Sequence, residues 1–274
     1  MNKLKIIDLF CGSGGFTLGF LKEKFEVQLA IDHDPYCEQV YKKNLPTTNF
    51  VLQNLSQINK KIFLGLKPDV VVGGPPCQGF STIGSRISSI EKKREKKDIR
   101  NNLVFSFIEH VNYLNPKIFL MENVSGILTR DKGEIFHELT KKIKKFGYKY
   151  EVFKLDAVNY GVPQFRKRVF IIGTKEEKYE ISKPNITHGE NFLLEEEIKI
   201  NSVIKDLAKI KIDESINHVP LKHKPTNLKR YRLIPEGGRL PEEKLPKELF
   251  RKNFGNTFKR LHRNKRLFWF FSNF

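Results

Sequence analysis

Asp69-Val-Val-Val-Gly-Gly-Pro-Pro-Cys-Gln-Gly-Phe-Ser81 is the stretch from which the fold of this chain can be inferred. Val70 to Val72 is a short apolar run, which indicates a buried strand of a parallel sheet. Gly73-Gly74 breaks the strand, and Pro75-Pro76 stiffens the turn because proline fixes its own φ and keeps the preceding residue extended. Cys77 therefore follows the carboxyl end of a buried strand, where open α/β sheets bind their ligands.

Two interpretations of Cys77 compete. A free cysteine is most often a small, inert core residue, whereas a cysteine thiolate is a strong nucleophile near neutral pH. Two prolines and a glycine would remove ladder bonds and packing from a core strand. The neighbours of Cys77 therefore favour a catalytic nucleophile.

Composition limits the class of protein. The 274 residues, 39% of them hydrophobic, suffice for one substantial core and a smaller lobe. No apolar run approaches the roughly 20 residues that span a bilayer, and residues 1–5 lead into a strand pattern without a signal peptide. The three cysteines, Cys11, Cys37 and Cys77, are widely spaced and show no CxxC pattern. We therefore expect a cytoplasmic protein with no membrane contact and no metal site.

The net charge of +19 favours a polyanionic partner, most simply nucleic acid. Residues 222–266 hold fifteen Lys and Arg against four Asp and Glu, with aromatic residues between them. The alternative is a lysine-rich composition that makes every surface basic.

The first 60 residues follow the pattern of a nucleotide-binding α/β fold. Leu4–Leu9 is predicted as a strand, and the glycine-rich turn 8–15 leads into a helix that ends near Lys24. Asp8 would repel a phosphate, so it suits a cationic or zwitterionic ligand better. A second strand, Val27–Ile31, ends at Asp32, an acid that at this place commonly binds ribose hydroxyls. His33 could lie against an adenine ring.

Asp32 could instead cap the helix predicted at Pro35–Lys43, although Asp34, directly before Pro35, fits the capping rules better. Val51–Ser56 is predicted as a weak third strand. The charged run 85–100 indicates either a mobile loop that closes over a phosphate backbone or a solvated helix face.

A second candidate residue follows the next strand. Asn101–Leu114 has helical spacing, and Ile118–Met121 is a buried strand with Glu122 at its carboxyl end. Glu122 should therefore face the same crevice as Cys77, where partial burial would raise its pKa and let it donate a proton. The alternative is a salt bridge or a helix cap.

The late part of this region predicts a helix at Gly133–Phe146 and a hairpin of Tyr150–Leu155 with Val169–Gly173. Arg166 and Arg168, in the segment that leads into Val169–Gly173, alternate on one strand face, where they suit carboxylate, phosphate or base-edge acceptors. The alternative is protection of an edge strand by charge.

The pattern weakens after Lys183. We predict a doubly wound, mostly parallel α/β sheet in residues 1–183 and a small, irregular, DNA-facing lobe in residues 184–274.

Taken together, these motifs resemble the DNA (cytosine-5) methyltransferases. The resemblance rests on Asp8–Gly15, Gly73–Ser81, Glu122-Asn123-Val124 and Gln164–Arg168, which occur in the family's order. It implies a Rossmann-like S-adenosylmethionine-dependent methyltransferase fold followed by a target-recognition region, and double-stranded DNA as the substrate. It also implies S-adenosylmethionine as the cofactor, with these residues at its site: Asp8, Phe10, Gly12, Ser13, Gly14, Gly15, Asp32, His33, Asn54, Leu55, Pro76 and Leu103. Asn54 replaces the family's usual aspartate, which accepts from the adenine amino group.

The resemblance also implies catalytic roles for four residues. Cys77 would attack carbon 6 of cytosine, and Glu122 would hydrogen-bond the ring nitrogen and exocyclic amine. Arg168 would contact the base carbonyl oxygen, and Arg166 would hold Glu122 or the backbone. The base must be flipped out of the duplex for this chemistry.

The C-terminal end departs from the family pattern. Family members usually continue to a Gly-Asn-Ala/Ser-Val-Pro motif, whereas this sequence ends Arg266-Leu-Phe-Trp-Phe-Phe-Ser-Asn-Phe274. We expect a truncated or frameshifted chain or one half of a split enzyme. A complementing C-terminal subunit and a cognate restriction endonuclease are the partners that this predicts, beside DNA. The alternatives to an active enzyme of a restriction-modification system are a non-catalytic DNA-binding chain and an RNA cytosine-5 methyltransferase.

Overall fold

The structure is a computed structural model that describes residues 3–76, 102–191, 193–214 and 223–235, with single positions at 219, 240, 241, 245, 246 and 249. Cys77 and the charged run 85–100 lie outside the described residues. The chain divides into two compact units, Met1–Ile198 and Lys199–Phe274. The functional division predicted after residue 183 stays a prediction.

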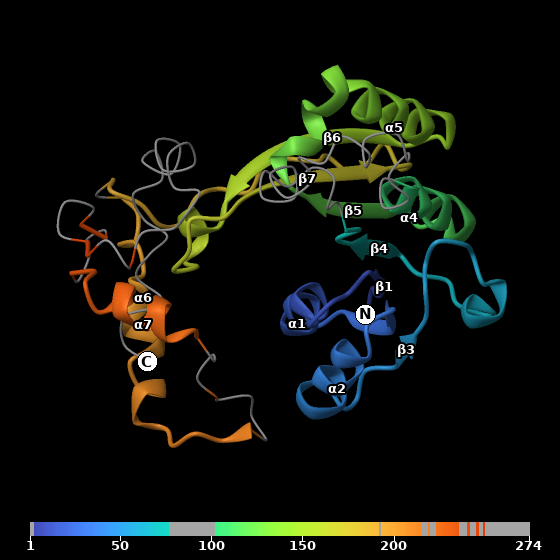
Figure 1. The fold of residues 1–274 in the computed structure, drawn as a ribbon. Helices are drawn as coiled ribbons and strands as arrows, with labels where there is room; N and C mark the ends of the chain where they lie inside the picture. Colours follow the sequence, from blue (N-terminus) through green and yellow to red (C-terminus); the bar gives the residue numbers. More distant parts are fainter. Residues whose placement is uncertain are drawn as a thin grey trace. The chain divides into compact units, whose positions relative to one another are not determined.

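The first unit is built on one seven-stranded sheet, as the sequence predicted. The strand order is β3-β2-β1-β4-β5-β7-β6 (Figure 1). Strands β1 to β5 pair in parallel, whereas β7 is antiparallel to both β5 and β6. Their bounds are β1 Lys5–Leu9, β2 Glu26–Asp32, β3 Phe50–Leu52, β4 Val70–Gly73, β5 Ile118–Asn123, β6 Lys149–Asp156 and β7 Lys167–Thr174.

Helices cover both faces of this sheet. Strand residues alternate between faces, so Ile7 and Val71 pack with α4 and α5, whereas Ile6 and Val72 pack with Phe16 and other residues around α1. The helices are α1 Gly15–Lys22, α2 Pro35–Asn44, α4 Asn102–Leu114 and α5 Glu134–Lys145, with single 3-10 turns η1 Lys60–Phe63, η4 Ser125–Leu128, η5 Arg130–Gly133 and η6 Ala157–Tyr160.

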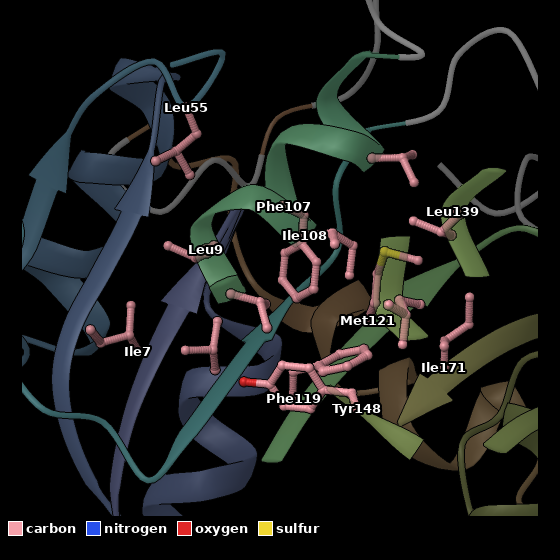
Figure 2. Close-up of a cluster of buried hydrophobic side chains, with 14 of the residues drawn as sticks. Ile7, Leu9, Leu55, Phe107, Ile108, Phe119, Met121, Leu139, Tyr148 and Ile171 are labelled. Atoms are coloured by element: carbon pink, nitrogen blue, oxygen red, sulfur yellow. The ribbon is translucent and has the colours of Figure 1, made fainter. Parts of the chain in front are cut away.

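The main core lies between the sheet and the α4–α5 face. Phe107 of α4, Phe119 of β5 and Tyr148 are almost completely buried there, and their rings stack edge to face in sequence (Figure 2). Such aromatic pairs add about 1 kcal/mol each beyond the area they bury. The core therefore fixes β5, the strand that carries the candidate catalytic acid Glu122 near its carboxyl end.

The chain reverses its direction across the sheet between β1 and β4. From β1 it builds outward to β2 and β3 and then returns to β4 on the other side of β1. The carboxyl ends of the two strands at such a reversal leave a crevice between their loops. The glycine turn after β1 and the Gly74–Pro76 loop after β4 both start at this crevice.

Gly73 allows β4 to lie close to β1 at this point. It pairs with Leu9, and a Cβ added at Gly73 would lie 2.2 Å from the Leu9 carbonyl oxygen and 2.8 Å from a ring carbon of Phe107. Backbone cannot give way as a flexible side chain can, so no other residue fits here without a shift of the strand.

Gly73→Ala is therefore expected to lower the free energy of unfolding by about 3 kcal/mol, the upper part of the usual range for overpacking. Urea denaturation measures the change. Gly19→Ala is the control, because Gly19 is helical and a Cβ there meets nothing within 4 Å. That substitution should be neutral or stabilising by up to about 1 kcal/mol. Equal unfolding midpoints for the two variants would contradict the steric argument.

The described residues within 184–195 pack back onto the turn η6. The backbone amides of Thr187 and His188 both donate to the Asn159 carbonyl oxygen at 3.0 Å, and the Tyr160 hydroxyl donates to the Pro184 carbonyl oxygen at 3.1 Å. The His188 ring lies against Gly161, and its Nε2 is 3.2 Å from a Glu195 carboxylate oxygen. We call residues 184–195 the return segment.

The described part of the second unit contains the short helices α6 Ile200–Ile204 and α7 Pro225–Tyr231 and the 3-10 turn η7 Leu207–Lys209. Across all the described ranges, no helix combines the length and the apolar character that crossing a bilayer requires.

Candidate active site

The glycine turn after β1 has a strained backbone. Phe10, Gly12 and Gly14 all have positive φ, at 56°, 53° and 89°. The left-handed conformation costs a residue with a side chain about 1–2 kcal/mol, so Phe10 stores strain in this turn. Local bonds hold the turn, because the Cys11 amide donates to Ile31 O and the Gly14 amide to Cys11 O, both at 3.0 Å. The N-terminus of α1 follows directly, where its amides and dipole favour an anionic group.

Asp8, at the carboxyl end of β1, supports this turn through hydrogen bonds to α1. Its side chain has no exposed surface, and its Oδ2 accepts from the Thr17 amide at 3.0 Å and the Thr17 hydroxyl at 2.8 Å. The Thr17 hydroxyl also lies 2.8 Å from the Tyr41 hydroxyl of α2. Asp8 Oδ1 is buried without a hydrogen-bond partner among the described residues. Asp8 thus connects β1 to the first turn of α1. Its predicted direct contact with the cofactor stays a prediction.

Burial raises the pKa of the Asp8 carboxyl from 3.8 to about 7, against the opposing effect of the two Thr17 hydrogen bonds. A raised carboxyl pKa means that, between about pH 4 and pH 7, the folded protein keeps a proton that the unfolded chain releases. This group therefore makes the free energy of unfolding fall as pH rises through that window, by about 1 kcal/mol per pH unit.

Asp8→Asn is expected to remove this pH dependence. Urea denaturation at several pH values between 4.5 and 7.5 should show the variant gaining stability relative to the wild type as pH rises. Glu138→Gln, which changes an exposed carboxylate of α5, is the control and should leave the slope unchanged. If the Asp8→Asn and wild-type curves ran parallel, the assignment would be wrong.

Asp32 ends β2 and organises the neighbouring backbone. Its Oδ2 accepts from the Gly12 amide at 2.9 Å, and its Oδ1 accepts from the amides of His33 and Asp34 at 2.7 and 3.0 Å. The helix cap is Asp34, whose Oδ1 accepts from the Tyr36 amide with Pro35 at the first helical position. The alternative that Asp32 caps this helix is therefore not what the structure shows. The exposed His33 ring lies beside it, with Nδ1 3.1 Å from Asp32 Oδ1.

The residues present fit S-adenosylmethionine, the cofactor implied by the resemblance. A Cβ built at Gly12 or Gly15 meets nothing within 4 Å, so there is open space directly against the turn. A carboxylate oxygen accepts about two hydrogen bonds, which leaves Asp32 Oδ2 capacity for a ribose hydroxyl. The cofactor's carboxylate suits the N-terminus of α1.

The predicted adenine-side residues lie after β3. Asn54 is exposed. Its Oδ1 accepts from the Ser56 amide at 2.8 Å, so its Nδ2 points away from that amide. Leu55 is buried, and its carbonyl oxygen accepts from the Ser106 hydroxyl of α4. Leu103, in the first turn of α4, is half-buried. Ser13 is exposed at the glycine turn.

The candidate acid Glu122 lies beside the loop that leads to Cys77. One carboxylate oxygen of Glu122, Oε2, is 3.3 Å from the position of a Cβ at Gly74. The other, Oε1, is 2.8 Å from Nε of Arg168, and both side chains are about one quarter exposed. A Glu from β5 and an Arg from the antiparallel neighbour β7 thus meet at the edge where the Gly74–Pro76 loop emerges.

The two arginines differ. Arg168 lies within β7 and pairs with Glu122, while its Nη1 donates to the Lys167 carbonyl oxygen at 2.9 Å. Arg166 precedes the strand with an exposed side chain, and its backbone amide donates to Asp156 Oδ1 at 2.8 Å. The structure therefore assigns the contact with Glu122 to Arg168. The role predicted for Arg166, to hold Glu122 or the backbone, stays a prediction.

Asn123 is a site residue to which sequence reasoning gave no role. Its side chain is almost completely buried, its Nδ2 donates to the Pro75 carbonyl oxygen at 3.2 Å, and its Oδ1 accepts from the Val124 amide at 2.9 Å. The signal in the sequence is a polar residue inside an apolar strand, next to a candidate acid. Its partner lies 48 positions away, which no local pattern indicates.

The two other cysteines are poor nucleophiles. Burial raises the pKa of the Cys11 thiol far above its usual value, with the charge of Asp8 adding to the effect. Burial also raises the pKa of Cys37 to about 11. Both thiols therefore stay protonated near neutral pH, whereas the reactive form of cysteine is the thiolate. Pro76, half-buried, is the last described residue before Cys77.

Among the described residues, no three His, Cys, Asp or Glu side chains are grouped so that they could hold a metal ion. The described residues offer a strained glycine turn at a helix N-terminus, an acid paired with a guanidinium, and a proline-braced loop that precedes Cys77 in the sequence. Acid-assisted nucleophilic addition to a planar base is the chemistry that these groups suit.

Comparison with known proteins places the chain in a family. A family model described as C-5 cytosine-specific DNA methylase matches residues 4–264. The chain is 33% identical over 242 residues to the Type II methyltransferase M1.HphI of Haemophilus parahaemolyticus, an alignment that covers 86% of this chain and 62% of that relative. It is 38% identical over 199 residues to the Type II methyltransferase M.AquIA of Picosynechococcus sp., covering 68% and 77%.

A solved structure shares the fold. The Entamoeba histolytica methyltransferase EhMeth has a TM-score of 0.59 at 21% identity, over 86% of this chain and 68% of that one. The chain spans about half the length of several curated relatives, including 42% of M.AgeI and 50% of M.DdeI.

Proposed function

We propose a function from one premise: the chain belongs to the C-5 cytosine-specific DNA methylase family. The proposed reaction transfers a methyl group from S-adenosylmethionine to carbon 5 of cytosine within a specific duplex DNA sequence. The relatives named above are Type II methyltransferases, so we also propose that the protein is the modification enzyme of a restriction-modification system with a cognate endonuclease.

Each proposed catalytic residue solves one part of the chemistry. Carbon 5 of cytosine is a weak nucleophile, so the Cys77 thiolate adds to carbon 6 and makes carbon 5 electron-rich. Glu122 donates a proton to the ring nitrogen as this bond forms, which avoids a charged ring. The bound cofactor supplies an electrophilic methyl group. Carbon 5 then loses its proton to a base, and the bond between carbon 6 and the Cys77 sulfur breaks to release the thiolate. The ring nitrogen returns its proton to the Glu122 carboxylate, which restores both residues.

The observation that carries this proposal is the position of Glu122. Its carboxylate lies between Arg168 of β7 and Gly74 of the loop that leads to Cys77, so a base held by the acid would lie next to that loop. A guanidinium has five N–H donors. Arg168 can therefore hold Glu122 and still contact the base carbonyl oxygen, and this second contact is the role that the resemblance implies for it. Arg166, exposed at the start of the strand, suits the DNA backbone.

The cofactor role rests on the crevice at the chain reversal. We propose that the methionine part of the cofactor lies against Gly12, Ser13, Gly14 and Gly15, with Asp8 holding the turn from below. Asp32 would accept from the ribose hydroxyls, and the adenine ring would lie among Phe10, His33, Asn54, Leu55 and Leu103. Pro76 would line the side that faces the base.

A methyl-transfer assay tests the proposal. The chain would be incubated with tritiated S-adenosylmethionine and unmethylated random-sequence duplexes, and the DNA digested to nucleosides. We expect label in 5-methyldeoxycytidine. Parallel arms would add a C-terminal polypeptide as a complementing subunit, or replace DNA by RNA of the same sequences.

The arms separate the alternatives. Label only with the added polypeptide would support a split enzyme. Label in RNA but not in DNA would assign the chain to RNA cytosine-5 methylation. Absence of label in every arm, with DNA binding intact in a mobility-shift assay, would leave the non-catalytic DNA-binding alternative.

A further inference from the structure

The Gly74–Pro76 loop has almost no means of anchoring itself. Proline lacks a backbone N–H, so Pro75 and Pro76 cannot donate hydrogen bonds, and the loop can be fixed only through its carbonyl oxygens or through Gly74. Pro75 is buried. A buried carbonyl without a donor costs about 1–3 kcal/mol, so the loop needs a donor from another element.

Asn123 is that donor. Its carboxamide has only one productive orientation, because its oxygen accepts from the Val124 amide while its nitrogen donates to the Pro75 carbonyl oxygen. If the carboxamide were flipped, its nitrogen would face the Val124 amide, so that two donors would meet. Its oxygen would then face the Pro75 carbonyl oxygen, so that two acceptors would meet. Near-complete burial of the side chain at 3% exposure removes water as a competing partner, which makes this link stiff.

The link joins the two halves of the proposed catalytic pair. Asn123 is the strand neighbour of Glu122, and Gly74 of the same loop lies against the Glu122 carboxylate. Cys77 follows Pro75 by two residues, one of which is another proline. We propose that Asn123 is a positioning residue, whose amide holds the Pro75 carbonyl so that Cys77 reaches carbon 6 of a base held by Glu122. This inference rests on the proposed function.

Two substitutions separate positioning from general stability. Asn123→Ala removes both hydrogen bonds. Asn123→Asp keeps the size and the bond to Val124, but as a carboxylate it sets an acceptor against the Pro75 oxygen. A protonated carboxyl at this position can donate to Pro75, so this variant should recover as pH falls. Thr140→Ala is the control, since Thr140 is a buried polar residue of α5 whose hydroxyl donates within its own helix.

The readout is covalent trapping. Random-sequence duplexes that contain 5-fluorocytosine, together with S-adenosylmethionine, hold the enzyme as an adduct because carbon 5 carries fluorine in place of the proton that must leave. We expect Asn123→Ala to slow single-turnover trapping at least tenfold, with cofactor affinity within twofold of the wild type. At pH 8 the trapping rate of Asn123→Asp should be lowered as much as that of Asn123→Ala. The ratio of its trapping rate to that of the wild type should rise as pH falls to 6.

A second readout does not need turnover. The rate of Cys77 alkylation by iodoacetamide, measured by mass spectrometry relative to Cys37 in the same molecules, should change at least threefold in Asn123→Ala. Trapping by Asn123→Ala and Asn123→Asp at the wild-type rate would overturn the inference. A wild-type chain that forms no adduct counts against the proposed function instead. In that case the alkylation ratio decides the inference, and an unchanged ratio overturns it. If Asn123→Ala does not fold, Asn123→Asp decides in both assays.

Discussion

Cys77→Ala is expected to reduce methyl transfer to background while DNA binding is retained. Alanine cannot form the bond to carbon 6, and without that bond carbon 5 of cytosine does not become nucleophilic. Enzymes of this kind lose the whole benefit of covalent catalysis when the nucleophile is removed. Incorporation of tritiated methyl groups into duplex DNA measures the loss, and a mobility-shift assay at fixed salt measures binding, since such affinities depend steeply on salt.

Cys37→Ala is the matched control for this substitution. Cys37 is half-buried in α2, and its pKa of about 11 keeps it protonated near neutral pH. Its replacement should leave the methyl-transfer rate within about twofold of the wild type. Transfer that survived in Cys77→Ala would show that the nucleophile is misassigned. Loss of DNA binding in the same variant would show that the substitution disturbed more than the thiol.

Glu122→Gln is expected to lower the rate of methyl transfer by about 10²–10⁴-fold, the usual contribution of a positioned general acid. Glutamine keeps the shape of the side chain but cannot deliver a proton to the ring nitrogen, and it weakens the pairing with Arg168. The effect should fall mainly on kcat, because the proton is needed as the bond to carbon 6 forms. Single-turnover methylation at saturating DNA measures it.

Glu151→Gln provides the comparison, because Glu151 is an exposed carboxylate of β6. That variant should methylate DNA at the wild-type rate. Arg168→Ala alone and together with Glu122→Gln completes a double-mutant cycle. If Arg168 acts partly by orienting Glu122, the combined loss should be smaller than the product of the single losses. Wild-type rates in Glu122→Gln would remove Glu122 from the mechanism.

Much of the sheet could be predicted because its signals are local. The apolar runs at Ile6 and Val70 become β1 and β4, and the glycine and proline breaks after them become the turns of the crevice. Asp34 before Pro35 gives the helix cap at the predicted residue. Propensity and hydrophobic pattern agree in these segments, which makes their fold readable from sequence.

The remaining features depend on contacts between distant residues. The sequence predicted a hairpin of β6 and β7, but only pairing with β5 places β7 inside the sheet, so that Arg168 meets Glu122. The burial of Asp8 follows from the packing of Thr17 and Tyr41 around it. A pattern of residue types showed an acid at a strand end without showing whether solvent or ligand could reach it.

The return segment has a consequence for exchanging recognition regions between related enzymes. Thr187 and His188 satisfy the Asn159 carbonyl oxygen, and the His188 ring covers Gly161, a few residues before Arg166 and Arg168. A chimera spliced near residue 183 would replace this cover with foreign sequence and leave that carbonyl exposed. A splice after Ile198, where the first compact unit ends, keeps the turn η6 together with the return segment that covers it. Only the region after Ile198 is then exchanged.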